Sequence, residues 1–312
     1  MDMRQLKHFV AVAERGNMVG AAKMVHVTQS TLSKSVAALE ERLGVRLFNR
    51  GPRGVTPTAY GEKLLTHAKL ILSQARRTEE DIRALVDGTG GHVRIGFGAN
   101  FAGFMLPQAI LKVISGRPGI TVSIISKPFD ELLPMLREGD LDLAVVVFPP
   151  EQAQPGLTYE PLIVSEFCTV CRPSHPLAGK RRIELPELSR QAWVLFDRPK
   201  AMQILFATVF LDHDLQPPQP VIATSSVFFL KSALMQGDYL SFIPPGLVYE
   251  EIRAGSLVKL PTEIPAIKTT AGIVCRTDDV LPAAASDVVD ELRAMRTSVG
   301  GRGLATHVLK AI

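Results

Sequence analysis

A chain of 312 residues is too long for one small core and predicts two or three domains of about 100–150 residues each. Hydrophobic residues make up 46% of the chain and charged residues 21%, which is typical of a globular protein and not of a disordered one. The sequence has no apolar run of about 18 residues and no secretory signal at its start, so we expect no membrane partner. Three cysteines are too few for a disulfide framework and predict a reduced, cytoplasmic protein.

The positive charge is concentrated near the N-terminus, since residues 1–60 hold nine Lys or Arg against four Asp or Glu. Residues 61–90 hold five of each sign, and the remainder is nearly balanced. A basic segment favours a polyanionic partner, because Lys and Arg displace the counterions condensed on phosphates. Chance asymmetry that serves solubility is the alternative, because an excess of five charges is modest.

The first sixty residues predict a helix-turn-helix. Apolar spacing indicates helices over 3–15, 20–25 and 29–43, with Gly16 and Asn17 ending the first helix and Thr28 suited to cap the third. Two short helices, a tight turn and a third helix with a polar leading end are typical of this motif. The expected inner stripe of the third helix is Leu32, Val36, Leu39 and Leu43.

A β-hairpin wing is expected next, from two short apolar strands over 45–48 and 55–58 around a tip rich in Gly, Pro and Arg. The leading face of a third helix reads base edges in this motif, and arginines on a wing suit phosphates or a minor groove. The predicted DNA-binding residues are therefore Thr28, Gln29, Ser30, Thr31, Ser33, Lys34, Arg50 and Arg53.

Residues 58–87 predict one long helix that links this domain to the rest of the chain. Its apolar positions step alternately by four and three residues over three heptads, which favours pairing with a second helix. The alternative is a helix packed on its own domain. The predicted dimerisation residues are Leu64, Ala68, Ile71, Ala75, Ile82 and Leu85.

After a Gly-rich hinge at 87–91, strands alternate with helices, which predicts an α/β domain with a parallel-type sheet. Expected strands are 92–97, 120–125, 141–148, 166–172, 193–196, 221–223, 239–243 and 271–276. Expected helices are 101–114, 130–138, 200–211, 226–235, 245–254 and 282–295. The Gly-rich tail over 299–312 has no clear role.

The N-terminal region strongly resembles the LysR-type transcription regulators of bacteria. The matching residues are AAKMVHVTQSTLSKSVAALEERLGVRLFNR from Ala21 to Arg50 and TPTAYG from Thr56 to Gly61. A weaker likeness continues through GDLDLAV at 139–145, HPLA at 175–178 and the strand that ends at Pro244. Ser30 departs from the pattern, where a proline is common. Phe129 departs as well, where a hydroxyl residue often lies in the effector cleft.

The resemblance implies a winged helix-turn-helix over 1–60, a dimerisation helix over 58–87 and a sensor over 88–298 with two lobes like those of periplasmic binding proteins. Lobe one would comprise 91–163 and 269–298, and lobe two 164–268. An effector would bind between the lobes and alter how a tetramer, built as a dimer of dimers, holds its promoter. The expected partners are double-stranded DNA, a small molecule, further copies of the chain and RNA polymerase.

Ligands in open α/β sheets bind beyond the carboxyl ends of the strands. The predicted effector-binding residues at those ends are Asn100, Phe101, Phe129, Val147, Phe148, Arg198 and Thr224. The mixture of apolar, hydroxyl and basic groups favours a small organic acid.

Parts of the sequence are compatible with two other functions. A dinucleotide-binding enzyme would need a third glycine where Phe101 stands after Gly96 and Gly98, and the histidines form no catalytic motif, so we expect no enzyme and no cofactor. A solute-binding module would not need the basic winged helix. Cys168 and Cys171 form one CxxC inside an apolar run, and we interpret them as strand hydrophobes facing opposite sides and not as metal ligands.

Overall fold

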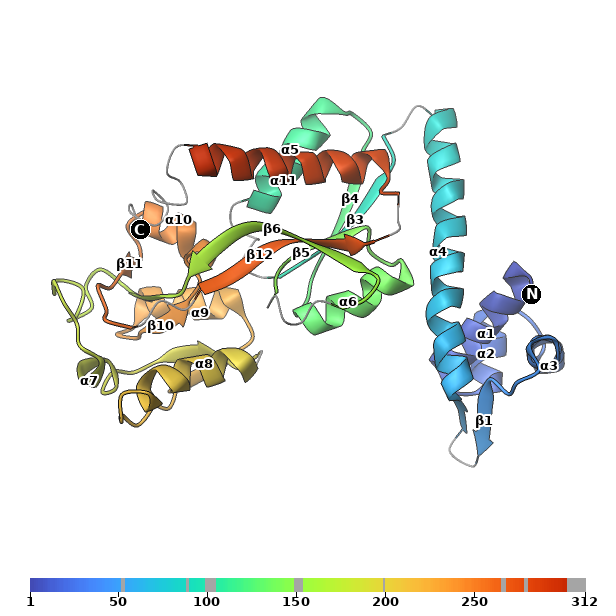
Figure 1. Ribbon diagram of the computed structural model, residues 1–312, viewed down its shortest axis with the longest axis horizontal. Helices are drawn as coiled ribbons and strands as arrows, with labels where there is room; N and C mark the ends of the chain where they lie inside the picture. Colours follow the sequence, from blue (N-terminus) through green and yellow to red (C-terminus); the bar gives the residue numbers. More distant parts are fainter. Residues whose placement is uncertain are drawn as a thin grey trace.

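The computed structural model describes residues 1–51, 54–87, 90–98, 105–148, 154–198, 200–264, 268–277 and 280–301. A small N-terminal domain lies at one end of a long helix, α4, and a two-lobed α/β region lies beside the other end of that helix (Figure 1). In the part of the chain that is described, no helix is both long enough and apolar enough to cross a membrane.

The N-terminal domain packs three helices against a two-stranded wing. These elements are α1 (Met3–Arg15), α2 (Met18–Met24), α3 (Gln29–Leu43), β1 (Phe48–Gly51) and β2 (Gly54–Pro57). Helices α1 and α3 end where the sequence predicts, because Gly16 and Gly44 adopt the left-handed conformation that stops a helix. Leu32, Val36 and Leu39 form the inner stripe of α3, but Leu43 is exposed beside that stop and does not belong to it.

The wing strands differ from the predicted bounds. The first strand begins three residues later than expected, at Phe48. The backbone around Leu47 is already engaged: its N–H donates to Glu40 Oε1 at 2.7 Å and its carbonyl accepts from Thr58 N at 2.9 Å. Strand pairing therefore starts at Phe48, opposite Pro57.

Helix α4 (Ala59–Asp87) meets different surroundings along its length. Ala68 has 0% of its surface exposed and belongs to the core of the N-terminal domain, with Leu64 packed against the same core. The predicted seam therefore needs correction, because Ala68 cannot contact a second subunit. Further along, Ile82 is 57% exposed and Leu85 is 83% exposed, so the apolar stripe has no partner within the described chain there.

Lobe one contains a five-stranded sheet in the order β4-β3-β5-β12-β6. Its strands are β3 (His92–Phe97), β4 (Thr121–Ser126), β5 (Leu143–Val147), β6 (Leu157–Glu166) and β12 (Lys268–Arg276). Strands β4, β3 and β5 are parallel, but β12 runs antiparallel to both of its neighbours, so the sheet is mixed and not simply parallel.

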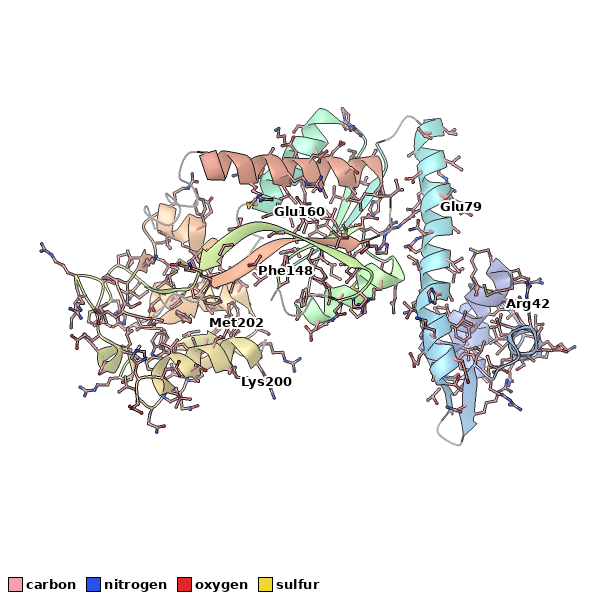
Figure 2. The ribbon with its side chains drawn as sticks, in the orientation of Figure 1. Arg42, Glu79, Phe148, Glu160, Lys200 and Met202 are labelled. Carbon is pink, nitrogen blue, oxygen red and sulfur yellow. The ribbon has the colours of Figure 1, made fainter. Side chains whose placement is uncertain are left out.

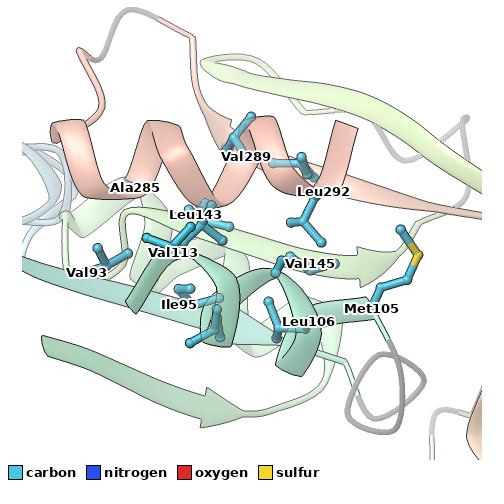
Figure 3. Packing of buried hydrophobic residues seen from close by; sticks show 14 of the residues in the cluster. Val93, Ile95, Met105, Leu106, Val113, Leu143, Val145, Ala285, Val289 and Leu292 are labelled. Carbon is cyan, nitrogen blue, oxygen red and sulfur yellow. The ribbon is translucent and has the colours of Figure 1, made fainter. Parts of the chain in front are cut away.

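Helices cover both faces of this sheet. One face packs against α5 (Met105–Gly116) and α11 (Ala283–Gly301), whose apolar side chains meet over β3 and β5 (Figure 3). The other face packs against α6 (Phe129–Glu138), which contributes Leu132, Leu133 and Leu136 to a second core.

Strand β6 was not predicted from the sequence. It is an edge strand that contains Pro161, and its register with β12 shifts between Ala271 and Gly272. A proline is tolerated at such an edge or bulge, where its missing N–H breaks no ladder. Gly272 is required there, because a Cβ atom would lie 2.0 Å from the Glu160 carbonyl oxygen.

Lobe two is built from shorter elements around the buried Trp193, whose indole N–H donates to the Leu188 carbonyl at 3.0 Å. Strands β8 and β9 are parallel, and β7 pairs antiparallel with β10 and β11. The strands are β7 (Cys168–Cys171), β8 (Val194–Phe196), β9 (Ile222–Thr224), β10 (Ser241–Ile243) and β11 (Val258–Lys259). The helices are α7 (Leu185–Leu188), α8 (Lys200–Leu211), α9 (Val227–Gln236), a 3₁₀ turn (Pro245–Val248) and α10 (Tyr249–Arg253).

Candidate functional site

The start of α3 presents a group of exposed hydroxyl and amide side chains. Thr28 caps the helix by accepting from Thr31 N at 3.2 Å, and its Oγ1 also lies 3.0 Å from Ser30 Oγ. Gln29, Ser30, Thr31 and Lys34 are exposed, whereas Ser33 is half-buried. The backbone and three hydroxyls thus hold one another in place, while Gln29 and Lys34 extend from the same helical end toward solvent.

Helix α2 and the turn after it orient this end of α3. Asn17 caps α2 by accepting from Gly20 N at 2.6 Å, so the residue that seemed only to break α1 also begins α2 two residues before the predicted start. Ala21 and Ala22 are buried and allow α2 to approach its neighbours closely. His26 turns the chain toward α3 with a left-handed φ of 55°.

The wing places Arg50 on the same domain as the α3 end. Phe48 and Val55 are buried on the inner side of the hairpin, whereas Asn49 and Arg50 are exposed. Arg53, the other predicted wing arginine, lies outside the described residues.

Glu40 is a positioning residue that the sequence analysis missed. Its Oε1 accepts from the N–H groups of both Leu47 and Phe48, at 2.7 and 3.2 Å, which ties the base of the wing to α3. The sequence signals this role only weakly, through an acidic residue beside the apolar face of α3. The partners of Glu40 are backbone N–H groups, which leave no pattern in the sequence.

In lobe two, the predicted residues Arg198 and Thr224 follow or end two adjacent parallel strands. Phe196 pairs with Thr224, and Asp197 N donates to the Thr224 carbonyl at 3.1 Å. Arg198 and Thr224 therefore lie together where the carboxyl ends of these two strands meet. Thr224 Oγ1 accepts from Ser226 N at 3.0 Å, and Ser226 caps α9. Arg198 is exposed.

In lobe one, Phe129 begins α6 and Val147 ends β5, and both are half-buried. They pack against opposite faces of the sheet, Phe129 with the α6 core and Val147 with the α5 core. Phe148 is buried, with its ring 5.2 Å from that of Tyr159, so it serves the core of lobe one first. Asn100 and Phe101 lie outside the described residues.

The two cysteines of β7 face separate cores, Cys168 toward α9 and Cys171 toward Trp193. Burial raises the pKa of each thiol to about 12. Within the described ranges, no three His, Cys, Asp or Glu side chains are grouped so that they could hold a metal ion.

Comparison with known proteins agrees with this arrangement in both parts of the chain. The family model described as "Bacterial regulatory helix-turn-helix protein, lysR family" matches residues 3–62, and the one described as "LysR substrate binding domain" matches residues 87–296. The SDS degradation transcriptional activation protein of a Pseudomonas species is 33% identical, over 91% of this chain and 93% of its own length.

Two further similarities cover different lengths. A probable hydrogen peroxide-inducible genes activator of Mycobacterium avium is 36% identical over 62% of this chain and 61% of its own length. The crystal structure of full-length CbnR with its target DNA superposes with a TM-score of 0.63 and 25% identity, covering 94% of this chain and 99% of that one. The matched families are classes of transcription regulators and not of enzymes. The chain belongs to the LysR family of bacterial transcription regulators.

Proposed function

We propose that this protein binds a promoter through the leading end of α3 and the wing, and that a small organic acid bound between the lobes changes that binding. The observation that carries the proposal is the exposed polar end of α3, held by the Thr28 cap next to a wing that exposes Arg50. A helix end of this kind enters the major groove in helix-turn-helix proteins, while basic wing residues bind the backbone. We place this activity in the bacterial cytoplasm, where DNA and RNA polymerase are available.

The DNA-binding proposal is tested with duplexes that the full-length chain selects from a random pool. A Gln side chain can bond an adenine in two places, which is worth about 1–3 kcal/mol of discrimination. We therefore expect Gln29→Ala to weaken binding to the selected duplex by about 5- to 150-fold, and binding to random DNA much less. Equal loss on both duplexes would remove Gln29 from sequence reading.

Lys34 has a matched control on the same helix. Lys34→Ala and Arg42→Ala each remove one exposed positive charge, but Arg42 lies in the last turn of α3, eight residues further along (Figure 2). We expect Lys34→Ala to weaken binding of the selected duplex and Arg42→Ala to leave it within about twofold. Equal losses would mean that only the total charge matters.

For the effector, the supporting observation is that Arg198 and the hydroxyl-capped start of α9 both lie at the carboxyl ends of β8 and β9. A guanidinium and helix N–H groups both favour an anion. We expect a thermal-shift screen of small carboxylic acids to find a stabilising acid. Its shift would be lost in Arg198→Gln but kept in Arg181→Gln, which removes an exposed charge elsewhere on lobe two.

Self-association would use two exposed apolar surfaces. The first is the exposed apolar stripe of α4, with Ile71, Ile82 and Leu85. The second interface would join two surfaces from different copies of the chain. One is the α5 and β4 surface of lobe one, which exposes Leu111 and Ile124, and the other is the α9 and β9 surface of lobe two, which exposes Val221 and Phe228. Strands β4 and β9 are both edge strands, so neither surface is covered by a neighbouring strand. Two distinct interfaces are what a dimer of dimers requires, and sedimentation of Ile124→Asp tests the second.

A further inference from the structure

Helix α4 is fastened to lobe one by a strip of polar side chains opposite its exposed apolar stripe. Lys69 Nζ lies 2.9 Å from Glu138 Oε2, and Ser73 Oγ donates to the Gly139 carbonyl at 2.6 Å. Arg77 pairs with Asp142 at 2.7 Å, and Glu80 pairs with Arg94 at 2.8 Å. The α4 members are spaced by four, four and three residues, so they share one side of the helix. Figure 2 shows side chains of α4 directed toward lobe one.

The centre of this strip is buried. Asp142 is 0% exposed and Arg77 is 6% exposed. Asp142 Oδ2 also accepts from Arg94 N at 2.6 Å, and the Arg77 guanidinium donates to the Gly139 and Leu141 carbonyls at 2.8 and 2.9 Å. A buried pair with all these partners holds one geometry, because displacing either charge leaves the other without compensation. We call Lys69, Ser73, Arg77 and the residues they contact over 138–142 the α4 clamp.

The clamp lies at the C-terminal end of α6, and the predicted effector residue Phe129 lies at the other end. Ten helical residues span about 15 Å, so α6 is a short rod between these two places. Its last turn is also tied to β12, because Arg276 donates to the Leu136 and Leu141 carbonyls. Gly139 follows with φ of 79°, and a Cβ atom there would lie 2.8 Å from Ser73.

The same clamp reaches the DNA-binding domain. Lys69 Nζ lies 3.4 Å from Glu14 on α1 as well as 2.9 Å from Glu138 on α6. Helix α4 itself packs Leu64 and Ala68 into the core of that domain. A displacement of the last turn of α6 therefore acts on a helix that is continuous with the DNA-binding core.

We propose that α6 and the α4 clamp couple the effector site to the DNA-binding domain, with Arg77 and Asp142 as the positioning residues. The inference rests on the proposed function, since it needs a DNA site and an effector site to connect. Coupling between two sites is reciprocal, so DNA must change the affinity for an effector by the same factor by which that effector changes the affinity for DNA. If α6 carries this coupling, DNA binding must alter α6 even when no effector is bound. This allows a test without an identified effector.

The test measures amide hydrogen exchange in the full-length chain, with and without a duplex that the chain selects from a random pool. In the wild type we expect the duplex to change exchange of the α6 amides, 129–138, by about fivefold or more. Arg77→Met should abolish this change while the duplex still protects α3. Arg83→Met is the matched control, because it removes an exposed arginine of α4 outside the clamp, and it should retain the full change.

A milder variant keeps the test decisive if Arg77→Met does not fold. The double substitution Lys69→Met with Ser73→Ala removes two clamp contacts and leaves the buried pair intact, and we expect it to reduce the change at α6. An unchanged α6 response in the variants, or no response in the wild type, would overturn the coupling role. Failure to select any duplex would instead refute the proposed function, so the two failures are distinguishable.

Discussion

The substitution Asp142→Asn tests how strongly the buried pair stabilises the docking of α4 on lobe one. The amide keeps the shape and can still accept from Arg94 N, but it leaves the Arg77 charge without its counter-ion. Removing one partner of a buried pair costs about 3–5 kcal/mol. Arg77 retains two carbonyl acceptors, on Gly139 and Leu141, so we expect the lower end of that range. About 3 kcal/mol corresponds to roughly a 150-fold change in the unfolding equilibrium.

The reverse substitution, Arg77→Met, should show a pH dependence. Burial already raises the pKa of Asp142 above its ordinary value of 3.8, against the opposing effect of Arg77. A carboxyl with a raised folded pKa binds its proton more tightly in the folded chain, so stability falls as pH rises from about 4 through the folded pKa. Without Arg77 the pKa rises further, and we expect the variant to be less destabilised at pH 5 than at pH 8.

Thermal and denaturant unfolding of the full-length chain measure both effects. For a region of 150–250 residues, a loss of about 3 kcal/mol lowers Tm by about 6–12 °C. Arg83→Gln, at an exposed site on the same helix, should stay within about 0.5 kcal/mol of the wild type. In the double variant of Arg77 and Asp142, the two losses should not add, because each single loss includes the stranded partner. Additive losses, or an Asp142→Asn variant within about 1 kcal/mol of wild type, would refute this reasoning.

Three further predictions concern assembly, DNA and redox chemistry. Ile82→Asp puts a charge in the proposed α4 seam and should lower the sedimenting mass, whereas Val280→Asp, at an exposed apolar residue outside α4, should keep it. Arg50→Ala should flatten the slope of log binding constant against log salt by about 0.9 for one lost phosphate contact, and an unchanged slope would leave Arg50 in solvent. Because the pKa of Cys168 and of Cys171 is raised to about 12, neither forms a reactive thiolate at pH 7, and peroxide should not alter DNA binding through them. A peroxide response lost in Cys168→Ser or Cys171→Ser would contradict this.

The helices of the DNA-binding domain could be predicted closely, because their ends are set by local chemistry. Thr28 caps the start of α3 with its side chain and Gly44 caps its end with its backbone N–H, and both residue types can be recognised in the sequence. The start of α2 was misplaced for the same local reason. Asn17 follows a helix stop, and only its bond to Gly20 N shows that it also begins the next helix.

Strand β6 was not predicted, because Pro161 interrupts its pattern and its pairing partner is remote in the sequence. Pro161 argues against a strand although the apolar residues 162–164 follow it, and the pairing partner, β12, lies about a hundred residues away. The strand exists because β12 returns to lobe one and leaves an edge to be paired. Likewise, the first wing strand begins late because the side chain of Glu40, on α3, accepts from the N–H groups of Leu47 and Phe48.

In helix α4, the apolar stripe could be predicted from the sequence, but the contacts of the polar stripe could not. At about 100° per residue, Ile71, Ile82 and Leu85 lie on one side of the helix, and Ser73 and Arg77 lie roughly 80–180° around the helix from them. The apolar stripe alone predicts pairing with another helix. The partners of the polar stripe are carbonyls and a carboxylate, which come close to α4 only in the folded chain.

The polar and apolar stripes of α4 would contact different parts of the assembly, and this arrangement has a consequence for regulation. The polar side is held by lobe one of the same chain, and the apolar side, which is exposed in the described part of the chain, is the surface that we propose for a second copy. A movement of lobe one that tilts or turns α4 must therefore also move the surface through which subunits would pair. Because α4 is continuous with the core that supports α3, such a movement would change the spacing of two recognition helices on DNA, which a fixed promoter tolerates poorly.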